Sequence, residues 1–290
     1  MAFVVFTDTS ANLPTKTLRE YDLPIVPFSY IKDGEALHCM DLDAFDADGF
    51  YAQLRGNKTV STSMINTTVF VEAWEPHLKD GFDILYVGMS SGISGSYSAA
   101  CAAASMLRDE FPERRIETFD TLAASLGEGF QAFDAAKMRL AGKSLDEVLV
   151  YLEGARKKMH QVFTVDDLLY LSRGGRVSRT AALAGTVLNI KPILQGDAEG
   201  KIVVTSKARG RKNAVRRLAD DYAEHADRGG LCGIAHGGCR EDAETLRGLL
   251  KTTDPACEVL IVDYEPVTGS HVGPGALALF YYGDEKQVKV

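Results

Sequence analysis

The feature that most constrains the fold is an alternation, in the first half of the chain, between short β-rich runs and helical patterns. The β-rich runs lie at Phe3–Phe6, Ile25–Ile31, Ile84–Val87 and Ile116–Phe119. This rhythm is typical of βαβ units, whose parallel strands are buried by helices on both faces. Pro24 and Pro27 flank and interrupt the second run, so we expect that run at a sheet edge or outside the sheet.

The pattern changes in the second half, from about Val162. Residues 188–209 contain two apolar runs joined by a short polar turn, with Gly196-Asp197 and Glu199-Gly200 as turn residues, which predicts an antiparallel hairpin. After it we expect a strand, a helix and a strand, at Leu231–Ala235, Glu241–Leu250 and Val259–Val262. The second half is therefore predicted to be α+β, with a helix layer on a largely antiparallel sheet.

The length of 290 residues favours two domains, because single domains usually have roughly 100–200 residues. We place the boundary near residue 160, after an amphipathic helix at Leu145–Lys158. The predicted division is an α/β domain at residues 1–160, with a mostly parallel sheet and flanking helices, and an α+β domain at residues 161–290.

Composition and charge argue against several classes of partner. Acidic residues number 40 and basic residues 32, and the resulting net charge of -8 disfavours binding to nucleic acid or anionic membranes. No apolar stretch approaches the roughly 18 residues of a membrane span, and the apolar N-terminal run has no basic leader. We expect a soluble, cytoplasmic protein without stable membrane insertion.

Cysteine usage gives no sign of a disulfide framework or a zinc site. The five cysteines are odd in number and include no Cys-x-x-Cys pair, so we expect most of them to be buried, reduced thiols. The sequence shows no metal-binding cluster and no glycine-rich nucleotide loop, so no cofactor is expected.

Three of the predicted strands in the first half are followed by residues of the same chemical types; we call these residues the strand exits. Hydroxyl and carboxylate residues follow the first, third and fourth β-rich runs, at Thr7–Ser10, Ser90–Ser96 and Asp120-Thr121. Ligands of open α/β sheets bind beyond the carboxyl ends of the strands, so these exits are expected to point at one cleft.

The stretch Gly88–Gly92 has the Gly-x-Ser-x-Gly spacing of a nucleophile elbow, with Ser90 as the nucleophile of a serine hydrolase. His236 and His271 are available as bases, and His236-Gly237-Gly238 resembles an oxyanion loop. That loop normally precedes the nucleophile, however, and the helix of an elbow begins at once, whereas here serine and glycine continue to Gly95. A hydrolase remains the alternative function.

The same loop also has the chemistry of an anion site. Ser94, Gly95 and Ser96 offer hydroxyls and backbone N–H groups ahead of an alanine-rich helix, whose N-terminal dipole favours negative charge. Ordinary capping of that helix by Ser96 or Ser98 explains the same residues. Thr62-Ser63 precede another helix, near Thr68, for which Asn66 or Thr67 is the expected cap.

Basic residues and a histidine form a second group of candidates. Arg173 and Arg176 flank Gly174-Gly175, a turn that could present a guanidinium to an oxyanion or simply be solvated. His271 stands among glycines, and we expect it exposed on a turn. A local positive face is predicted from Lys207, Arg209, Arg211 and Lys212.

Several of these stretches together resemble one protein family. In chain order they are Asp8-Thr9-Ser10 with Leu13-Pro14, Thr62-Ser63, Ser90–Ser96, Asp166-Asp167-Leu168, Arg173–Ser178, Ile190–Leu194 and Gly269–Gly275. The combination is similar to the DegV family of bacterial fatty-acid-binding proteins, and the resemblance covers nearly the whole chain.

The resemblance implies a two-domain carrier with a long-chain fatty acid buried between the domains, and not an enzyme in itself. For members that are fatty acid kinase subunits it also implies a separate ATP-binding partner that phosphorylates the carboxylate to an acyl phosphate. It makes Thr62 and Ser94 the carboxylate ligands, with Ser63, Gly95 and Ser96 as neighbours. Around the exposed head group, in docking or phosphoryl transfer, it places Arg176, Arg209 and His271, with Arg173 a weaker candidate.

Two motifs depart from the family pattern. The family's Thr-Ser-x-Pro-Ser is here Thr62–Asn66, and its Ser-Gly-Thr is Ser94-Gly95-Ser96. Thr62 and a hydroxyl at residue 96 are retained, so neither departure abolishes the site, and the acyl preference is left open. A lipid-responsive regulatory protein that never meets a kinase is a further alternative.

Overall fold

The computed structural model describes residues 2–56, 58–178 and 189–286, which form two compact units. The first unit joins the residues up to Phe45 to Ser61–Arg156, and the second joins Asp46–Val60 to the residues from Lys157 onward. The chain thus changes unit between Arg156 and Lys157, where the sequence predicted one boundary near residue 160. The excursion Asp46–Val60 was not predicted, because it depends on a tertiary contact of its helix that is described below.

The first unit contains the parallel sheet that the alternating pattern predicted. Its strands are hydrogen-bonded in the order β2-β1-β6-β7, and every pair is parallel. Their bounds are Phe3–Asp8 for β1, Ile25–Val26 for β2, Asp83–Gly88 for β6 and Ile116–Asp120 for β7. The short β2 is an edge strand, which confirms the effect expected of Pro24 and Pro27.

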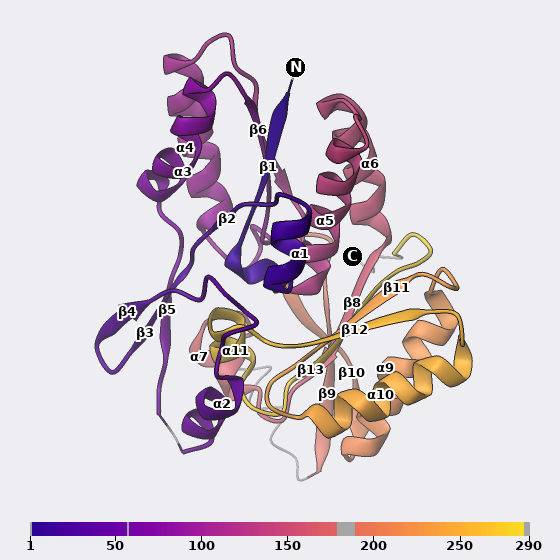
Figure 1. The fold of residues 1–290 in the computed structure, drawn as a ribbon. Helices are drawn as coiled ribbons and strands as arrows, with labels where there is room; N and C mark the ends of the chain where they lie inside the picture. The colour runs from indigo at the N-terminus through magenta and orange to yellow at the C-terminus, as the bar shows by residue number, and fades with distance from the viewer. Residues whose placement is uncertain (1, 57, 179–188, 287–290) are drawn as a thin grey trace. The chain divides into compact units, whose positions relative to one another are not determined.

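Helices cover both faces of this sheet. Figure 1 shows α3 and α4 on one side of β1 and β6, and α5 and α6 on the other. The bounds of the helices are Thr9–Ala11 (η1, a 3₁₀ turn), Thr15–Glu20 (α1), Thr67–Lys79 (α3), Ser96–Glu110 (α4), Leu126–Leu140 (α5) and Leu145–Lys158 (α6). Because β1 and β6 are covered on both faces, their residues are uniformly buried, as their continuous apolar runs predicted.

A small antiparallel sheet branches from the edge of the first unit. After β2 the chain enters β3 (Ser29–Lys32), which pairs with β4 (Glu35–Leu37) on one side and β5 (Ser61–Ser63) on the other. Thr62 lies in β5 opposite Tyr30. The second β-rich run is therefore divided between two sheets.

The second unit is built on a six-stranded sheet in the order β10-β9-β8-β13-β11-β12. All its pairs are antiparallel except β11 with β12, which confirms the predicted largely antiparallel α+β domain. The strands are β8 (Met159–Thr164), β9 (Ile190–Gly196), β10 (Ile202–Arg209), β11 (Leu231–His236), β12 (Glu258–Asp263) and β13 (Leu277–Tyr282). The predicted hairpin is β9–β10; Leu188, where its sequence begins, lies outside the described residues.

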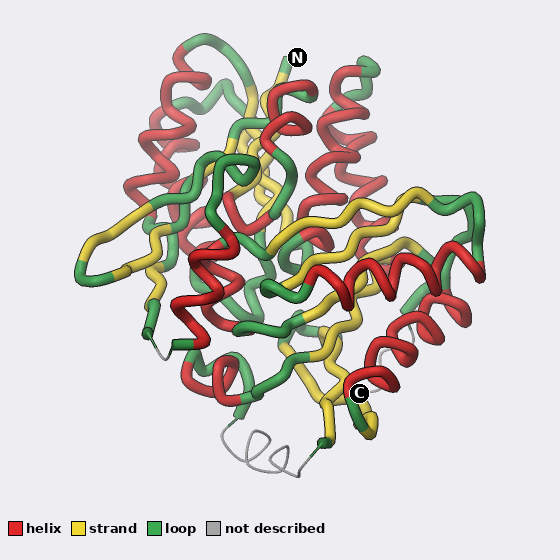
Figure 2. The backbone as a smooth tube through the Cα atoms, turned by 60° about the horizontal axis from the view of Figure 1, so that its bottom comes forward, coloured by secondary structure: helices red, strands yellow, loops and turns green. Residues whose placement is uncertain are grey.

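Two long helices pack on one face of this sheet. In Figure 2 they run side by side (red) along its strands (yellow). They are α9 (Arg211–His225) and α10 (Arg240–Thr253), and the core beneath them includes Val162, Leu218, Ile234, Leu246 and Leu279.

A second group of helices in this unit consists of α2 (Ala47–Arg55), α7 (Leu169–Arg173) and α11 (Pro266–Val272). Helix α11 contacts both α2 and α7, so the excursion from the first half of the sequence is held here. Asp46 caps α2 by accepting a hydrogen bond from Gly49 N at 2.9 Å.

Two further expectations can be compared with this fold. No helix in the described parts of the chain is long and apolar enough to cross a bilayer. All five cysteines are free thiols, but only Cys232 and Cys257 are fully buried and the other three are half-buried, so the expectation that most are buried was wrong. The half-buried cysteines lie after β4 (Cys39), within α4 (Cys101) and directly before α10 (Cys239).

Candidate functional site

The Ser94–Ser96 loop joins β6 to α4 and is organised by its own hydroxyls. The Ser94 hydroxyl accepts a hydrogen bond from Ser96 N at 3.2 Å and donates one to Ser96 Oγ at 3.1 Å. Ser96 Oγ also accepts from Ile65 N at 3.0 Å. The residue before α4, at its N-cap position, is Gly95, which has no side chain to cap the helix, so the alternative of capping by Ser96 or Ser98 was wrong.

The segment after Thr62 lies against this loop. Ile65 bonds to Ser96, and a Cβ atom built on Gly95 would lie 2.6 Å from Met64 Sδ. Met64 and Ile65, which directly follow the predicted Thr62-Ser63 pair, therefore contact the Ser94–Ser96 loop, although Ile65 and Ser96 lie 31 residues apart in the sequence. Asn66, which follows, caps α3 by accepting from Val69 N at 3.1 Å and confirms that expectation.

The start of α4 has the electrostatics of an anion site. The helix is 15 residues long, and its first turn carries no acidic residue and no side-chain cap. Its N-terminal N–H groups and its dipole favour a negative charge there. Ser94 is only 7% exposed, and the low dielectric of a buried site strengthens any hydrogen bond that its hydroxyl makes to a charged group.

Ser90 has the environment of a loop-shaping residue. It is fully buried, its hydroxyl accepts from Gly92 N at 3.1 Å, and its N–H donates to Ala123 O at 2.8 Å. Helix α4 starts six residues after it, later than an elbow requires. Both histidines of the first unit have other contacts: His38 Nδ1 with Phe28 O at 2.9 Å, and His77 with the Phe6 ring.

Hydroxyl and carboxylate residues follow β1, β6 and β7, as predicted. The residues after β6 and β7 contact each other, and those after β1 are buried. Ser91 N donates to both Asp120 carboxylate oxygens, at 3.2 and 3.3 Å, which joins the exits of β6 and β7. At the exit of β1, Asp8 is buried and accepts from Tyr86 OH at 2.6 Å and from Ser10 N at 2.8 Å. This exit is therefore part of the core.

Glu128 on α5 completes that buried network and was missed by the sequence analysis. Its carboxyl oxygens contact Thr7 Oγ1 at 3.1 Å and Ser10 Oγ at 2.8 Å, and Ser10 Oγ also contacts Asp8. Burial raises the pKa of Glu128 well above its ordinary value, and the charge of Asp8 raises it further. The only signal available was an acidic residue between two glycines in a helix otherwise rich in apolar residues.

His271 and Arg176 come together in the second unit. His271 lies in the last turn of α11, and a Cβ on Gly174 would lie 2.3 Å from its Nδ1. Burial, with the nearby charge of Arg176, lowers the pKa of His271 to about 4. The expectation of an exposed histidine on a turn was wrong, because the glycines around it let α7 and α11 approach closely.

The turn at Gly174-Gly175 is shaped by these contacts. Arg176 Nη1 donates to Gly174 O, and burial lowers the pKa of this guanidinium. The Arg173 guanidinium lies over the Tyr170 ring, 5.5 Å from its centre. Gly175 has a φ of 76°, a conformation that favours glycine.

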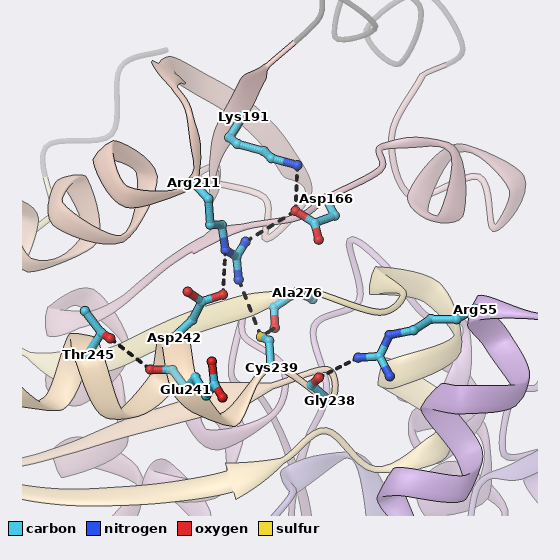
Figure 3. Close-up of polar contacts among 10 residues, drawn as sticks. All are labelled: Arg55, Asp166, Lys191, Arg211, Gly238, Cys239, Glu241, Asp242, Thr245 and Ala276. Carbon is cyan, nitrogen blue, oxygen red and sulfur yellow. Dashed lines mark hydrogen bonds and ion pairs between the residues drawn. The ribbon is translucent and has the colours of Figure 1, made fainter.

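The predicted positive face is only partly formed. Lys207 and Arg209 alternate on the exposed face of β10, and Lys212 is exposed on α9. Arg211 instead bonds to Asp242 at 2.9 Å and lies 3.8 Å from Asp166, which also pairs with Lys191 (Figure 3). Its charge is therefore largely neutralised within the unit.

His236 is a core residue at the end of β11. It is almost fully buried, and its Nδ1 lies 3.0 Å from Asp263 Oδ1 on the neighbouring strand β12. The glycines after it pack against Tyr51 of α2, so they serve packing of the helix group and not an oxyanion loop. Among the residues described here, no group of three or more His, Cys, Asp or Glu side chains could hold a metal ion.

Comparison with known proteins gives a consistent result along the whole chain. A family model described as "Uncharacterised protein, DegV family" matches residues 2–284. A DegV domain-containing protein of Clostridium perfringens is 38% identical over 288 residues, covering 98% of this chain and 99% of that protein. The DegV domain-containing protein YteA of Lactococcus lactis is 33% identical over 97% of both chains.

Solved structures share the fold. A DegV family protein of Thermus thermophilus, described for its fatty acid binding, superposes with a TM-score of 0.86 at 28% identity, covering 98% of this chain and all of that one. DegV of Bacillus subtilis, a fatty acid binding protein, gives 0.83 at 30% identity with the same coverage. The Fatty Acid Kinase (Fak) B3 protein of Streptococcus pneumoniae, loaded with linoleic acid, gives 0.84 at 19% identity, covering 98% and 100%.

Proposed function

The chain belongs to the DegV family, and we propose that it binds a long-chain fatty acid and presents the carboxylate to an ATP-binding kinase partner for conversion to an acyl phosphate. The observation that carries the proposed fatty acid binding is that Met64 and Ile65, which follow Thr62, lie against the Ser94–Ser96 loop at the start of α4. Fatty acid binding by the DegV proteins of Thermus thermophilus and Bacillus subtilis, whose fold this chain shares, supports it.

In the proposed complex the Thr62 and Ser94 hydroxyls hold the carboxylate. Each hydrogen bond to a charged group contributes about 1.5–3 kcal/mol, whereas fifteen methylenes buried at about 0.8 kcal/mol each give on the order of 10 kcal/mol before association costs. The acyl chain therefore sets affinity, and the hydroxyls set orientation. Neutral hydroxyls suit a carboxylate that has to react, because a permanent ion pair would compete with its phosphorylation.

We assign the acyl chain to the face of the six-stranded sheet opposite α9 and α10. Side chains alternate along a strand, so while Val162, Ile234 and Leu279 pack under the helices, their neighbours point to the other face. That face is apolar, and it combines small residues with two phenylalanines: Phe163, Gly233, Ala235, Ala278 and Phe280.

The transfer step is a displacement at phosphorus. A carboxylate oxygen attacks the γ-phosphorus of ATP held by the partner, a new O–P bond forms, the bond to the β–γ bridging oxygen breaks, and ADP leaves. Because His271 has a pKa of about 4, it is uncharged at pH 7 and Arg176 is the cation of the pair. We propose that Arg176 stabilises the transferring phosphoryl group and that exposed Arg209 contributes to docking of the partner.

Lipid extraction tests the binding proposal. Denaturing extraction and mass spectrometry of freshly purified protein should give about one fatty acid per chain, and a Thr62→Ala, Ser94→Ala double variant should retain much less. The matched control is Ser61→Ala with Ser98→Ala, which changes one exposed serine in the strand of Thr62 and one in the helix that follows Ser94. Lipid-free wild-type protein that takes up no added fatty acid would rule the proposal out.

Reconstitution tests the transfer proposal. Lipid-loaded protein, ATP and the ATP-binding subunit of a bacterial fatty acid kinase should yield an acyl phosphate, trapped as the hydroxamate with hydroxylamine. Arg176→Lys should slow the reaction more than tenfold without loss of bound lipid, because a single ammonium does not reproduce the guanidinium fork. Bound lipid without acyl phosphate from any such partner would favour the lipid-responsive regulatory alternative.

A further inference from the structure

The helix of the excursion, α2, is held in the second unit partly by a tyrosine of its own, Tyr51. Tyr51 is fully buried, and its hydroxyl donates to Tyr264 O, two residues before α11, at 2.8 Å. A Cβ on Gly269 of α11 would lie 2.3 Å from that hydroxyl oxygen. The ring also lies against Gly237 and Gly238, where a Cβ would come within 3.3 and 2.9 Å of Tyr51 atoms.

A second tyrosine bonds back to α2 from the other side. Tyr170 of α7 donates its hydroxyl to Leu54 O at 3.1 Å, and a Cβ on Gly273 at the end of α11 would lie 2.5 Å from its ring. Arg55, at the end of α2, donates to Gly238 O, as Figure 3 shows. Helix α2 is thus bonded to α7, to the residues before α11 and to the loop after β11.

Helix α11 depends on such contacts for its position. It has only seven residues, and a helix that short is not stable by itself. Glu265 caps its first turn by accepting from Val267 N at 2.6 Å, which fixes the start of the helix but not the direction of its last turn. His271 lies in that last turn, against Gly174 of the α7 turn.

We propose that Tyr51 is a positioning residue: through Gly269 and the Tyr264 carbonyl it holds α11 so that the His271 ring lies against Gly174 beside Arg176. Tyr170 has the matching role on the α7 side. The importance of this arrangement for transfer rests on the proposed function, but the arrangement itself is independent of it. Loss of the Tyr51 hydroxyl should let the end of α11 move and admit water to His271.

Titration of His271 tests the proposal without any partner. In Tyr51→Phe the His271 pKa, followed by NMR and assigned with His271→Gln, should rise from about 4 toward the ordinary 6.5, because burial is the main cause of its low value. The control is Tyr222→Phe, which removes the hydroxyl of another buried tyrosine; this hydroxyl donates to Asp254 on the α9 and α10 side. The proposal is overturned if His271 titrates unchanged in Tyr51→Phe, or equally changed in both variants.

A double-mutant cycle tests the contact itself. Gly269→Ala should shift the His271 pKa strongly, since its Cβ meets the Tyr51 oxygen at 2.3 Å. Tyr51→Phe removes that oxygen, and the next Tyr51 atom is 3.2 Å away, so the double variant should be closer to wild type than Gly269→Ala alone. Additive changes of the His271 pKa in the two single variants and the double variant would contradict the proposed coupling. If Gly269→Ala does not fold, recovery of folding in the double variant supports the coupling, and its failure to recover contradicts it.

Measurements of bound lipid and of acyl phosphate formation distinguish a failure of this proposal from a failure of the proposed function. Tyr51→Phe should retain fatty acid at the wild-type level while acyl phosphate formation falls several-fold at saturating partner, and Tyr222→Phe should change neither. If wild-type protein binds no lipid, the proposed function fails, and the His271 titration still decides the positioning role. If transfer in Tyr51→Phe is normal despite a shifted pKa, Tyr51 positions His271 without serving the reaction, and that part of the proposal is withdrawn.

Discussion

At the scale of single residues, the buried contacts among Asp8, Ser10 and Glu128 require a shared proton. Ser10 Oγ contacts Asp8 Oδ1 and Glu128 Oε2, yet one hydroxyl has only one proton to donate. If both carboxyl groups were ionised, one of these contacts would bring two acceptors together. Burial raises the pKa of both groups, so we assign the additional proton to this pair.

The buried carboxyl pair, Asp8 and Glu128, makes the free energy of unfolding depend on pH. A carboxyl group whose pKa is raised on folding stabilises the native state fully below the unfolded pKa of about 4.3, and this contribution is lost as the pH rises through the folded value. Between pH 5 and 8 the wild type should therefore lose stability relative to Glu128→Gln, by at most about 1.4 kcal/mol per pH unit for one proton. Urea unfolding at several pH values measures the difference.

The groups that face this pair are few. Tyr86 from β6, with Thr7 and Ser10 from the β1 side, contact the two carboxyl groups, and Asp120 acts on Tyr86. As a control, Glu147→Gln alters an exposed carboxyl group whose pKa is lowered to about 2, so its effect should be constant above pH 5. Parallel stability curves for wild type and Glu128→Gln would contradict the shared proton.

At the scale of elements, two helices with hydroxyl or amide residues before them begin in different ways. Asn66 caps α3, whereas the hydroxyls before α4 bond to each other and to Ile65. Both starts looked like caps in the sequence, because the same polar residues suit caps and ligand sites. Which role a residue has depends on where its side chain points.

Removal of the α3 cap should have a measurable cost. Asn66→Ala is expected to lower the free energy of unfolding by about 1 kcal/mol. Ser98→Ala, in the first turn of α4, should be neutral or slightly stabilising, because Ser98 is exposed and alanine has the higher helix propensity. Chemical denaturation of both variants tests the difference, and an equal loss would show that Ser98 also caps.

Two helical glycines should respond to alanine in opposite directions. A Cβ on Gly129 of α5 would lie 2.3 Å from Ala11 O, a backbone atom that cannot turn aside, whereas Gly154 of α6 has open space. Gly154→Ala should stabilise the protein by about 0.5–1 kcal/mol, and Gly129→Ala should destabilise it by more than that. Thermal unfolding of both variants checks this, and a stabilised Gly129→Ala would mean that α5 is free to shift from η1.

At the scale of the whole molecule, the residues proposed for carboxylate binding and those proposed for phosphoryl transfer belong to different units of the chain. Thr62 and Ser94 belong to the first unit, and Arg176 and His271 to the second. The excursion that contains α2 leaves the first unit after Phe45 and rejoins it at Ser61, directly before Thr62. The two units are therefore linked through the chain at three points.

Fatty acid should consequently stabilise both units. At a free ligand concentration of about 100 Kd, the free energy of unfolding should rise by about 2.7 kcal/mol. Fluorescence of the single tryptophan, Trp74 of α3, reports on the first unit, and hydrogen exchange in α9 and α10 reports on the second. Stabilisation of one unit alone would place the ligand entirely within it.

The sequence by itself determined the fold class, most strand and helix positions and the main candidate residues, because these depend on local periodicity, on turn residues and on motif resemblance. Only the tertiary structure decided the place of α2, the partial burial of His271 and the partner of Asp8. Each of these depends on a close approach between residues far apart in the sequence, such as Tyr51 with Gly269 or Ser10 with Glu128. Local sequence patterns do not indicate such contacts, because a single sequence does not distinguish a glycine that makes room for an aromatic ring from a glycine in a turn.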